Sequence, residues 1–152
     1  PGNDLSADAR EARIARFFDP YHAALADVLE TTKPALVVSL HSFTPLLASQ
    51  PDQKRPWHVG VLYNQDDRAA RIALPLLEQE GLTVGDQQPY SGKLLNATMN
   101  RHAEANGIRY LGIEIRQDKL CDAAGAARWA EILEPVARAC CNSLANQGDL
   151  RT

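Results

Sequence analysis

Three side chains able to do acid–base or metal chemistry lie at the ends of two predicted strands. His41 directly follows the apolar run 35–40, and Glu114 and Arg116 close the run 109–116. In open α/β sheets the site lies in the crevice beyond the carboxyl ends of the strands, so we expect these three residues to lie near one another. Each also has an ordinary structural explanation: His41 as a hydrogen-bonded loop residue, and Glu114 with Arg116 as an ion pair on one strand face.

The other histidines give a weaker signal. His22 lies beside Tyr21 in a predicted helix, where a packing or capping role fits best. His58 begins a predicted strand and His102 lies in a short predicted helix, and each can either line a pocket or face solvent. No two of the four histidines have the HxxxH or HxH spacing of a self-contained metal motif, so spacing alone does not indicate a metal site.

Several common catalytic motifs are absent from the sequence. Ser42 lacks the flanking glycines of a G-x-S-x-G nucleophile elbow. There is no P-loop and no GxGxxG turn, which removes the usual sequence support for nucleotide binding. The cysteines are Cys121, Cys140 and Cys141, an odd number without CxxC spacing, which fits a reducing compartment. We therefore expect a cytoplasmic protein.

Helical and strand patterns alternate along the chain. Five segments carry the three- and four-residue apolar spacing of helices, the first two separated at Pro20: 6–18, 20–31, 66–80, 96–106 and 123–145. Three apolar or β-branched runs predict strands: 35–40, 57–63 and 109–116. The first of these strands is expected to be buried in a parallel sheet, and 84–92 is expected to be a loop. This order indicates an α/β three-layer sandwich with a mostly parallel or mixed sheet, formed by residues 1–152 as a single domain.

Composition and charge limit the classes of function. The 152 residues are 45% hydrophobic and 23% charged, the proportions of a globular protein with a core of its own. A net charge of −3 gives no basic excess, which argues against nucleic acid as a partner. No stretch approaches the roughly 20 apolar residues of a membrane-spanning helix, and the opening residues lack a signal-peptide pattern, so no membrane partner is expected.

A series of short motifs resembles the N-formylglutamate amidohydrolase family, in particular its predicted members. The motifs occur in family order over nearly the whole chain, which makes the series specific. They are 1–3 with the helix that follows, 19–22, 38–45 (VSLHSFTP), 55–63 (RPWHVGVLY), 89–92 (PYSG) and 112–118 (GIEIRQD). The resemblance implies a phosphorylase/hydrolase-like fold and a zinc-dependent amidase related to zinc carboxypeptidases and N-acetylmuramoyl-L-alanine amidases.

The same resemblance implies roles for two residues. In the family, the histidine of the HSFTP-like motif is a metal ligand and the glutamate of the EIRQD-like motif is the catalytic carboxylate, which places these roles on His41 and Glu114. The family's first metal-binding segment, a histidine and then an acidic ligand, precedes the point that matches Pro1. Catalytic zinc usually has three protein ligands and a water. We therefore expect this chain to be the carboxyl-terminal part of a longer catalytic domain. Alone it should bind Zn²⁺ poorly and be inactive. It should also leave a sheet edge or an apolar face open, with a tendency to form homo-oligomers.

The implied reaction is hydrolysis of the amide or formamide bond of a small N-formyl or N-acyl amino acid such as N-formylglutamate. Zinc would lower the pKa of its bound water to about 7, Glu114 would accept the water's proton, and Arg116 would stabilise the oxyanion or bind a substrate carboxylate. His58, Tyr90 and His102 are candidates for the pocket wall. Two alternatives stay open: a domain that binds a small acidic ligand through Arg116 and His58 without turnover, and a structural domain in which Glu114 and Arg116 pair.

Overall fold

Residues 4–146 are described by a computed structural model, in which the chain forms two compact units, Pro1–Pro34 and Ala35–Thr152. The first unit is helical and the second contains a four-stranded sheet with helices. None of the helices between residues 4 and 146 combines the length and apolarity needed to cross a lipid bilayer. The sequence analysis predicts that residues 1–152 form one domain and that this domain belongs to a longer catalytic domain, and both statements stay predictions.

The first unit is one continuous helical run in which Pro20 causes no break. It comprises α1 (Ala7–Arg13), the π-helical turn η1 (Ile14–Phe18) and α2 (Asp19–Thr32). Pro20 lies in the first turn of α2, where its missing N–H is tolerated, and the Asp19 N–H donates to the Ile14 carbonyl in the wider π-helical pattern. The predicted interruption at Pro20 is therefore wrong.

The second unit is built on a mixed sheet, as predicted. Its strands lie in the order β1 (Val37–Phe43), β4 (Tyr110–Arg116), β2 (Val59–Leu62) and β3 (Val84–Asp86). β4 runs parallel to β1 and antiparallel to β2, and β2 runs parallel to β3. The loop prediction is wrong at β3, because three residues with a glycine in the middle carry no strand pattern and form a strand only by pairing with β2.

β1 differs from its prediction in both place and burial. A continuous apolar run predicts a buried strand that ends before His41, but the strand continues to Phe43 and lies at the edge of the sheet. Val38 is 43% exposed and Leu40 is 57% exposed, because β1 has β4 as its one neighbour. His41 consequently lies within the strand and has a partner in β4.

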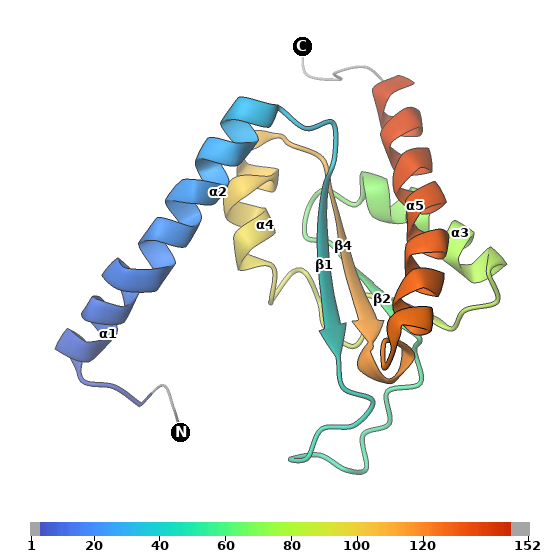
Figure 1. The fold of residues 1–152 in the computed structure, drawn as a ribbon, viewed down its shortest axis with the longest axis horizontal. Coiled ribbons are helices and arrows are strands. Elements are labelled where there is room, and N and C mark those ends of the chain that lie inside the picture. Colours follow the sequence, from blue (N-terminus) through green and yellow to red (C-terminus); the bar gives the residue numbers. More distant parts are fainter. Residues whose placement is uncertain (1–3, 147–152) are drawn as a thin grey trace. The chain divides into compact units, whose positions relative to one another are not determined.

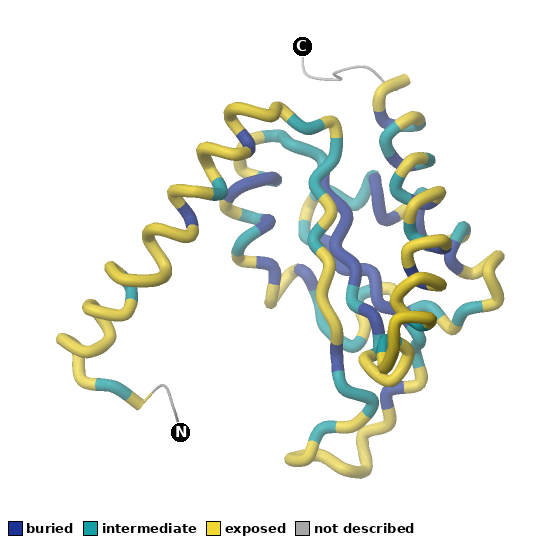
Figure 2. The backbone as a smooth tube through the Cα atoms, in the orientation of Figure 1, coloured by how far each residue is buried: buried dark blue, intermediate teal, exposed yellow. Residues whose placement is uncertain are grey.

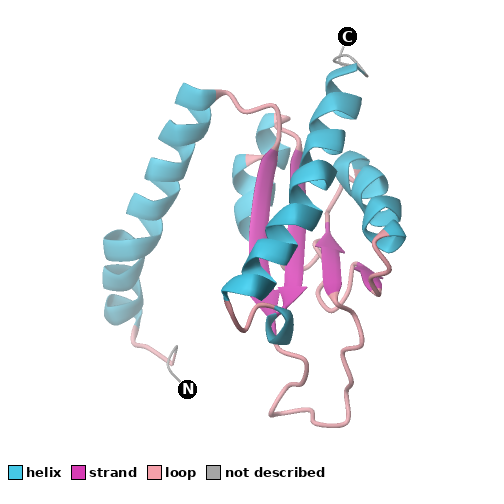
Figure 3. Ribbon diagram, turned by 45° about the vertical axis from the view of Figure 1, so that its right-hand side comes forward, coloured by secondary structure: helices cyan, strands magenta, loops and turns pink. Residues whose placement is uncertain are grey.

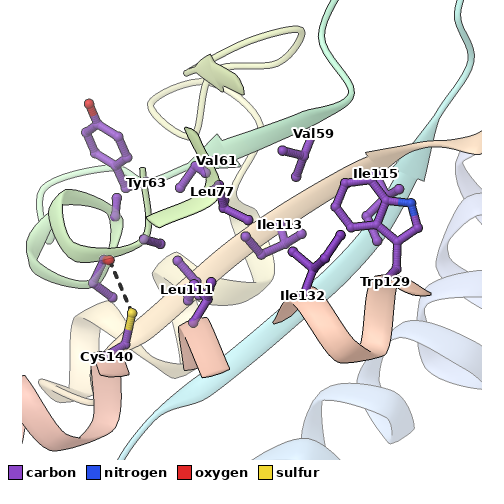
Figure 4. Close-up of a cluster of buried hydrophobic side chains, with 14 of the residues drawn as sticks. Val59, Val61, Tyr63, Leu77, Leu111, Ile113, Ile115, Trp129, Ile132 and Cys140 are labelled. Atoms are coloured by element: carbon purple, nitrogen blue, oxygen red, sulfur yellow. Dashed lines mark hydrogen bonds between the residues drawn. The ribbon is translucent and has the colours of Figure 1, made fainter. Parts of the chain in front are cut away.

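Helices cover both faces of this sheet (Figures 1 and 3). α3 (Arg68–Gln79) and α5 (Ala123–Asn146) pack on the face formed by Leu111, Ile113 and Ile115, which confirms the predicted apolar face of β4. Figure 4 shows side chains of α5 and β4 in this core, which is also where Figure 2 shows the most continuous burial. The opposite face carries Tyr110, which packs against Met99 of α4 (Ala97–His102).

Candidate functional site

His41 and Glu114 lie side by side on one face of the sheet. They are Cα partners in the parallel ladder between β1 and β4. Because side chains alternate between the faces of a sheet, His41 and Glu114 project to the face opposite Ile113 and Ile115. The structure therefore brings together the imidazole and the carboxylate that the sequence places in one site.

Both residues line one cavity of about 390 Å³. Strand β1 contributes Ser39 and His41 to this cavity, and β4 contributes Gly112 and Glu114. The remaining wall comes mainly from residues 94–99, which lead into the first turn of α4. A small polar ligand in this cavity would contact a strand floor on one side and a helix start on the other.

Glu114 has an oxygen that makes no hydrogen bond. Its Oε2 is buried and has no partner among the described residues. Burial raises the pKa of the Glu114 carboxyl above its ordinary value, while electrostatic interaction with His41 and Arg55 acts to lower it. A carboxyl with a raised pKa and an unused oxygen is suited to accept and return a proton.

Gly60 makes room for a loop beside Glu114. Gly60 of β2 is the Cα partner of Glu114 in the antiparallel ladder between β2 and β4. A Cβ at Gly60 would lie 2.1 Å from the Gln88 carbonyl oxygen and 3.3 Å from Pro89 Cδ. The loop can therefore cross the sheet only over a residue without a side chain, and Tyr90 follows directly in this loop.

Arg55 is a cation that acts on Glu114 from outside the residues lining the cavity, and the sequence analysis did not assign it. It lies in the loop between β1 and β2, yet it is only 7% exposed. Its Nη1 donates to the Thr44 carbonyl at 3.3 Å and to the Tyr90 hydroxyl at 3.1 Å, and its guanidinium carbon lies 5.0 Å from the Tyr90 ring centroid. A loop residue has no periodic pattern, so the signal available for Arg55 was its position in the motif 55–63.

The side chain of Arg116 makes its hydrogen bonds with residues other than His41 and Glu114. Its Nε and Nη2 donate to the two carboxylate oxygens of Asp118 at 2.7 and 3.2 Å. Its Nη1 donates to the backbone carbonyls of Arg55 and Pro56 at 3.2 and 3.1 Å. The alternative in which Glu114 and Arg116 pair is therefore wrong: the donors of Arg116 go to Asp118 and to backbone carbonyls, and Oε2 of Glu114 has none.

None of the three pocket-wall candidates, His58, Tyr90 and His102, is among the residues that line the cavity of His41 and Glu114. His58 lines a separate cavity of about 490 Å³ next to the start of α5. Its Nδ1 accepts from the Thr83 N–H at 3.1 Å, and burial, followed by the charges of Lys119 and Arg116, lowers the pKa of His58. His102 is buried at the carboxyl end of α4, whereas the cavity is lined by residues at the amino end of that helix.

Two neighbouring side chains of the described residues are of the types that bind zinc. His41 provides an imidazole beside the unused carboxylate oxygen of Glu114, and both are groups that bind zinc. Between residues 4 and 146, no three or more His, Cys, Asp and Glu side chains are placed to hold one metal ion. Because a catalytic zinc ion usually has three protein ligands, these residues fit such a site and do not complete it.

Comparisons with known proteins agree with this fold. A sequence model of the N-formylglutamate amidohydrolase family matches residues 2–121. The solved structure of a gene product from Agrobacterium tumefaciens is 28% identical in sequence with a TM-score of 0.84, and the match covers 94% of this chain and 57% of that chain. No curated protein sequence gave a match.

A second solved structure, an N-formylglutamate amidohydrolase from Ralstonia eutropha, is 18% identical with a TM-score of 0.56 and supports the fold alone. That match covers 93% of this chain and 55% of the other. The chain thus spans a little more than half the length of the two solved relatives. Since the family match extends over most of the sequence and includes His41 and Glu114, the chain belongs to the N-formylglutamate amidohydrolase family.

Proposed function

We propose that this chain carries the proton-transfer group and one metal ligand of a hydrolase that cleaves the amide or formamide bond of a small N-formyl or N-acyl amino acid. N-formylglutamate is the example that the family description suggests. The observation that carries the proposal is the buried, unpartnered Oε2 of Glu114 beside His41 in one cavity.

Glu114 holds and moves the proton in this reaction. As a carboxylate it accepts a proton from the attacking water, and it then gives that proton to the nitrogen of the departing amine. Arg55 takes the place of Arg116 as the cation of the site, because its charge acts on Glu114 while the donors of Arg116 are used elsewhere.

His41 is the residue of this chain that would hold the metal ion. When bound, Zn²⁺ would supply a Lewis acid for the substrate carbonyl and for the water. Two further ligands would have to come from outside residues 4–146, so we expect the 152-residue chain to have low zinc affinity and little activity by itself.

The incomplete ligand set also favours a second candidate function. A domain of the same fold could bind a small acidic ligand without turning it over, and such a domain needs no stoichiometric zinc. Elemental analysis distinguishes the two, because the hydrolase requires about one zinc ion per active site in its complete form.

The test compares variants in the complete product of the gene. Release of free amine is measured with a panel of N-formyl and N-acyl amino acids, and bound zinc is measured by elemental analysis. Glu114→Gln should lower turnover by about 100-fold or more and keep the zinc. His41→Ala should lose zinc, whereas His58→Ala, in a separate cavity, should keep zinc and turnover. Normal turnover of Glu114→Gln, or normal zinc in His41→Ala, would refute the assignment.

A further inference from the structure

One edge of the Arg55 guanidinium makes no hydrogen bond within the part of the chain that the structure describes. An arginine has five N–H donors, and both hydrogen bonds of the Arg55 side chain start from Nη1. Its Nε and Nη2 make no hydrogen bond with any described residue, although Arg55 is only 7% exposed.

Two other arginines of this protein show what the same edge binds. Nε and Nη2 of Arg68 donate to the two carboxylate oxygens of Asp66, each at 2.8 Å. Nε and Nη2 of Arg116 donate in the same way to Asp118. This side-by-side pair of N–H groups matches the two oxygens of a carboxylate, and such bidentate bonds are both strong and geometrically selective. The free edge of Arg55 thus has the geometry of a carboxylate receptor.

Two loop segments hold this guanidinium, and its charge acts on Glu114. The carbonyl of Thr44 accepts from Nη1, and Thr44 directly follows the last residue of β1, three residues beyond His41. Tyr90, the other partner, follows Pro89 in the loop that packs on Gly60, the ladder partner of Glu114. The guanidinium also lies close enough to influence the ionisation of Glu114.

The free edge is not sealed from solvent. Among the side-chain nitrogen and oxygen atoms of the described residues, only Oε2 of Glu114 is both sealed from solvent and unpartnered. Nε and Nη2 of Arg55 are therefore not sealed, even though the rest of the residue is buried. This positive edge is therefore held in place through Nη1 and is open to solvent, and its charge acts on the Glu114 carboxyl.

We propose that the Nε–Nη2 edge of Arg55 is a carboxylate-binding subsite that selects ligands with a free carboxylate. Tyr90 and Thr44 hold the guanidinium through Nη1, and the ligand carboxylate takes the place that Asp66 has on Arg68 and Asp118 has on Arg116. The inference rests on the proposed function, since the ligand is an N-acyl amino acid whose carboxylate lies at Arg55 and whose amide bond lies toward Glu114.

The experiment measures binding rather than turnover. N-formylglutamate and its neutral diamide are titrated into the complete gene product carrying Glu114→Gln, with binding followed by NMR chemical shifts. The acid should bind about 10- to 100-fold more tightly than the diamide, the ratio typical of charge-assisted hydrogen bonds. Arg55→Gln should remove this preference. Arg138→Gln, which deletes the same charge on the exposed face of α5, should keep it.

Arg55→Lys is a second variant that keeps the test decisive if Arg55→Gln fails to fold. It keeps a positive charge that can still donate to Thr44 but loses the two-pronged edge, so most of the preference should be lost while near-ultraviolet circular dichroism stays native. Equal binding of acid and diamide by the parent chain, or an undiminished preference in both Arg55 variants, would overturn the inference. If the preference depends on Arg55 but the complete gene product hydrolyses no substrate, the subsite stands and the proposed function fails.

Discussion

Replacement of Glu114 by glutamine should make the protein more stable while it removes the proposed base. Folding transfers Oε2 of Glu114 from water to a buried position without replacing its hydrogen bonds. An unpartnered buried polar group costs about 1–3 kcal/mol, and more when it is charged. Glutamine keeps a polar group in this place but no charge, so we expect the free energy of unfolding to rise by about 1 kcal/mol at about pH 8.

The gain should disappear in acid. In the folded protein burial raises the pKa of Glu114, whereas in the unfolded chain this pKa has its ordinary value of 4.5. Between these two values the folded state binds more protons than the unfolded state, so the stability of the parent protein falls as the pH rises through this window. Below pH 4.5 the carboxyl is largely neutral in both states, and glutamine then has no advantage.

Urea unfolding followed by tryptophan fluorescence at pH 4, 6 and 8, in buffer with EDTA to exclude metal, measures this difference. Glu104→Gln is the matched control with the opposite sign. The Glu104 carboxylate accepts from the Tyr110 hydroxyl at 2.9 Å, from Asn64 Nδ2 at 2.9 Å and from the Asp66 N–H at 3.1 Å. Its loss should destabilise the protein by about 1–3 kcal/mol. The reasoning would be refuted if the Glu114→Gln protein were less stable than the parent at pH 8, or if its stability gain over the parent were as large at pH 4 as at pH 8.

Three more substitutions test other parts of the fold. Gly60→Ala should lower the free energy of unfolding by about 1–3 kcal/mol, because its Cβ would lie 2.1 Å from the Gln88 carbonyl oxygen; an unchanged melting temperature would show that the loop yields easily. Tyr110→Phe should cost about 1–3 kcal/mol in urea unfolding, because it removes a hydroxyl that donates to Glu104. Burial raises the pKa of the Tyr110 hydroxyl to about 12, so phenolate absorption from it should be absent at about pH 10. Leu40→Lys should reduce any self-association seen by light scattering, since a charge on an edge strand opposes pairing between copies, and unchanged association would exclude this edge as the contact.

The neighbourhood of His41 and Glu114 was predictable because it depends on strand identity. Leu111, Ile113 and Ile115 alternate with Gly112 and Glu114, and this pattern alone assigns the two faces of β4. The apolar run before His41 identifies a second strand in the same way. Once two parallel strands are adjacent, residues at equivalent positions along them, such as His41 and Glu114, lie side by side.

Other features depend on tertiary contacts that leave no local pattern. The apolar run of β1 predicts a strand but not its place at the edge of the sheet. Val38 and Leu40 are apolar, and an apolar sequence looks the same whether or not a second strand covers it. β3 has three residues and exists only through its pairing with β2. Arg55 is buried by Thr44 and Tyr90, which are 11 and 35 residues away in the sequence, so no periodicity could indicate its position.

The bonds from Arg116 Nη1 to the carbonyls of Arg55 and Pro56 tie the backbone of the loop to the end of β4. Arg116 therefore acts as an anchor for the residue that we place against the ligand, without touching the ligand itself. An alanine scan would record a loss at both arginines and could mistake the anchor for the contact. Only a ligand-dependent readout, such as the ratio between acid and diamide, would separate the residue that binds from the residue that braces it.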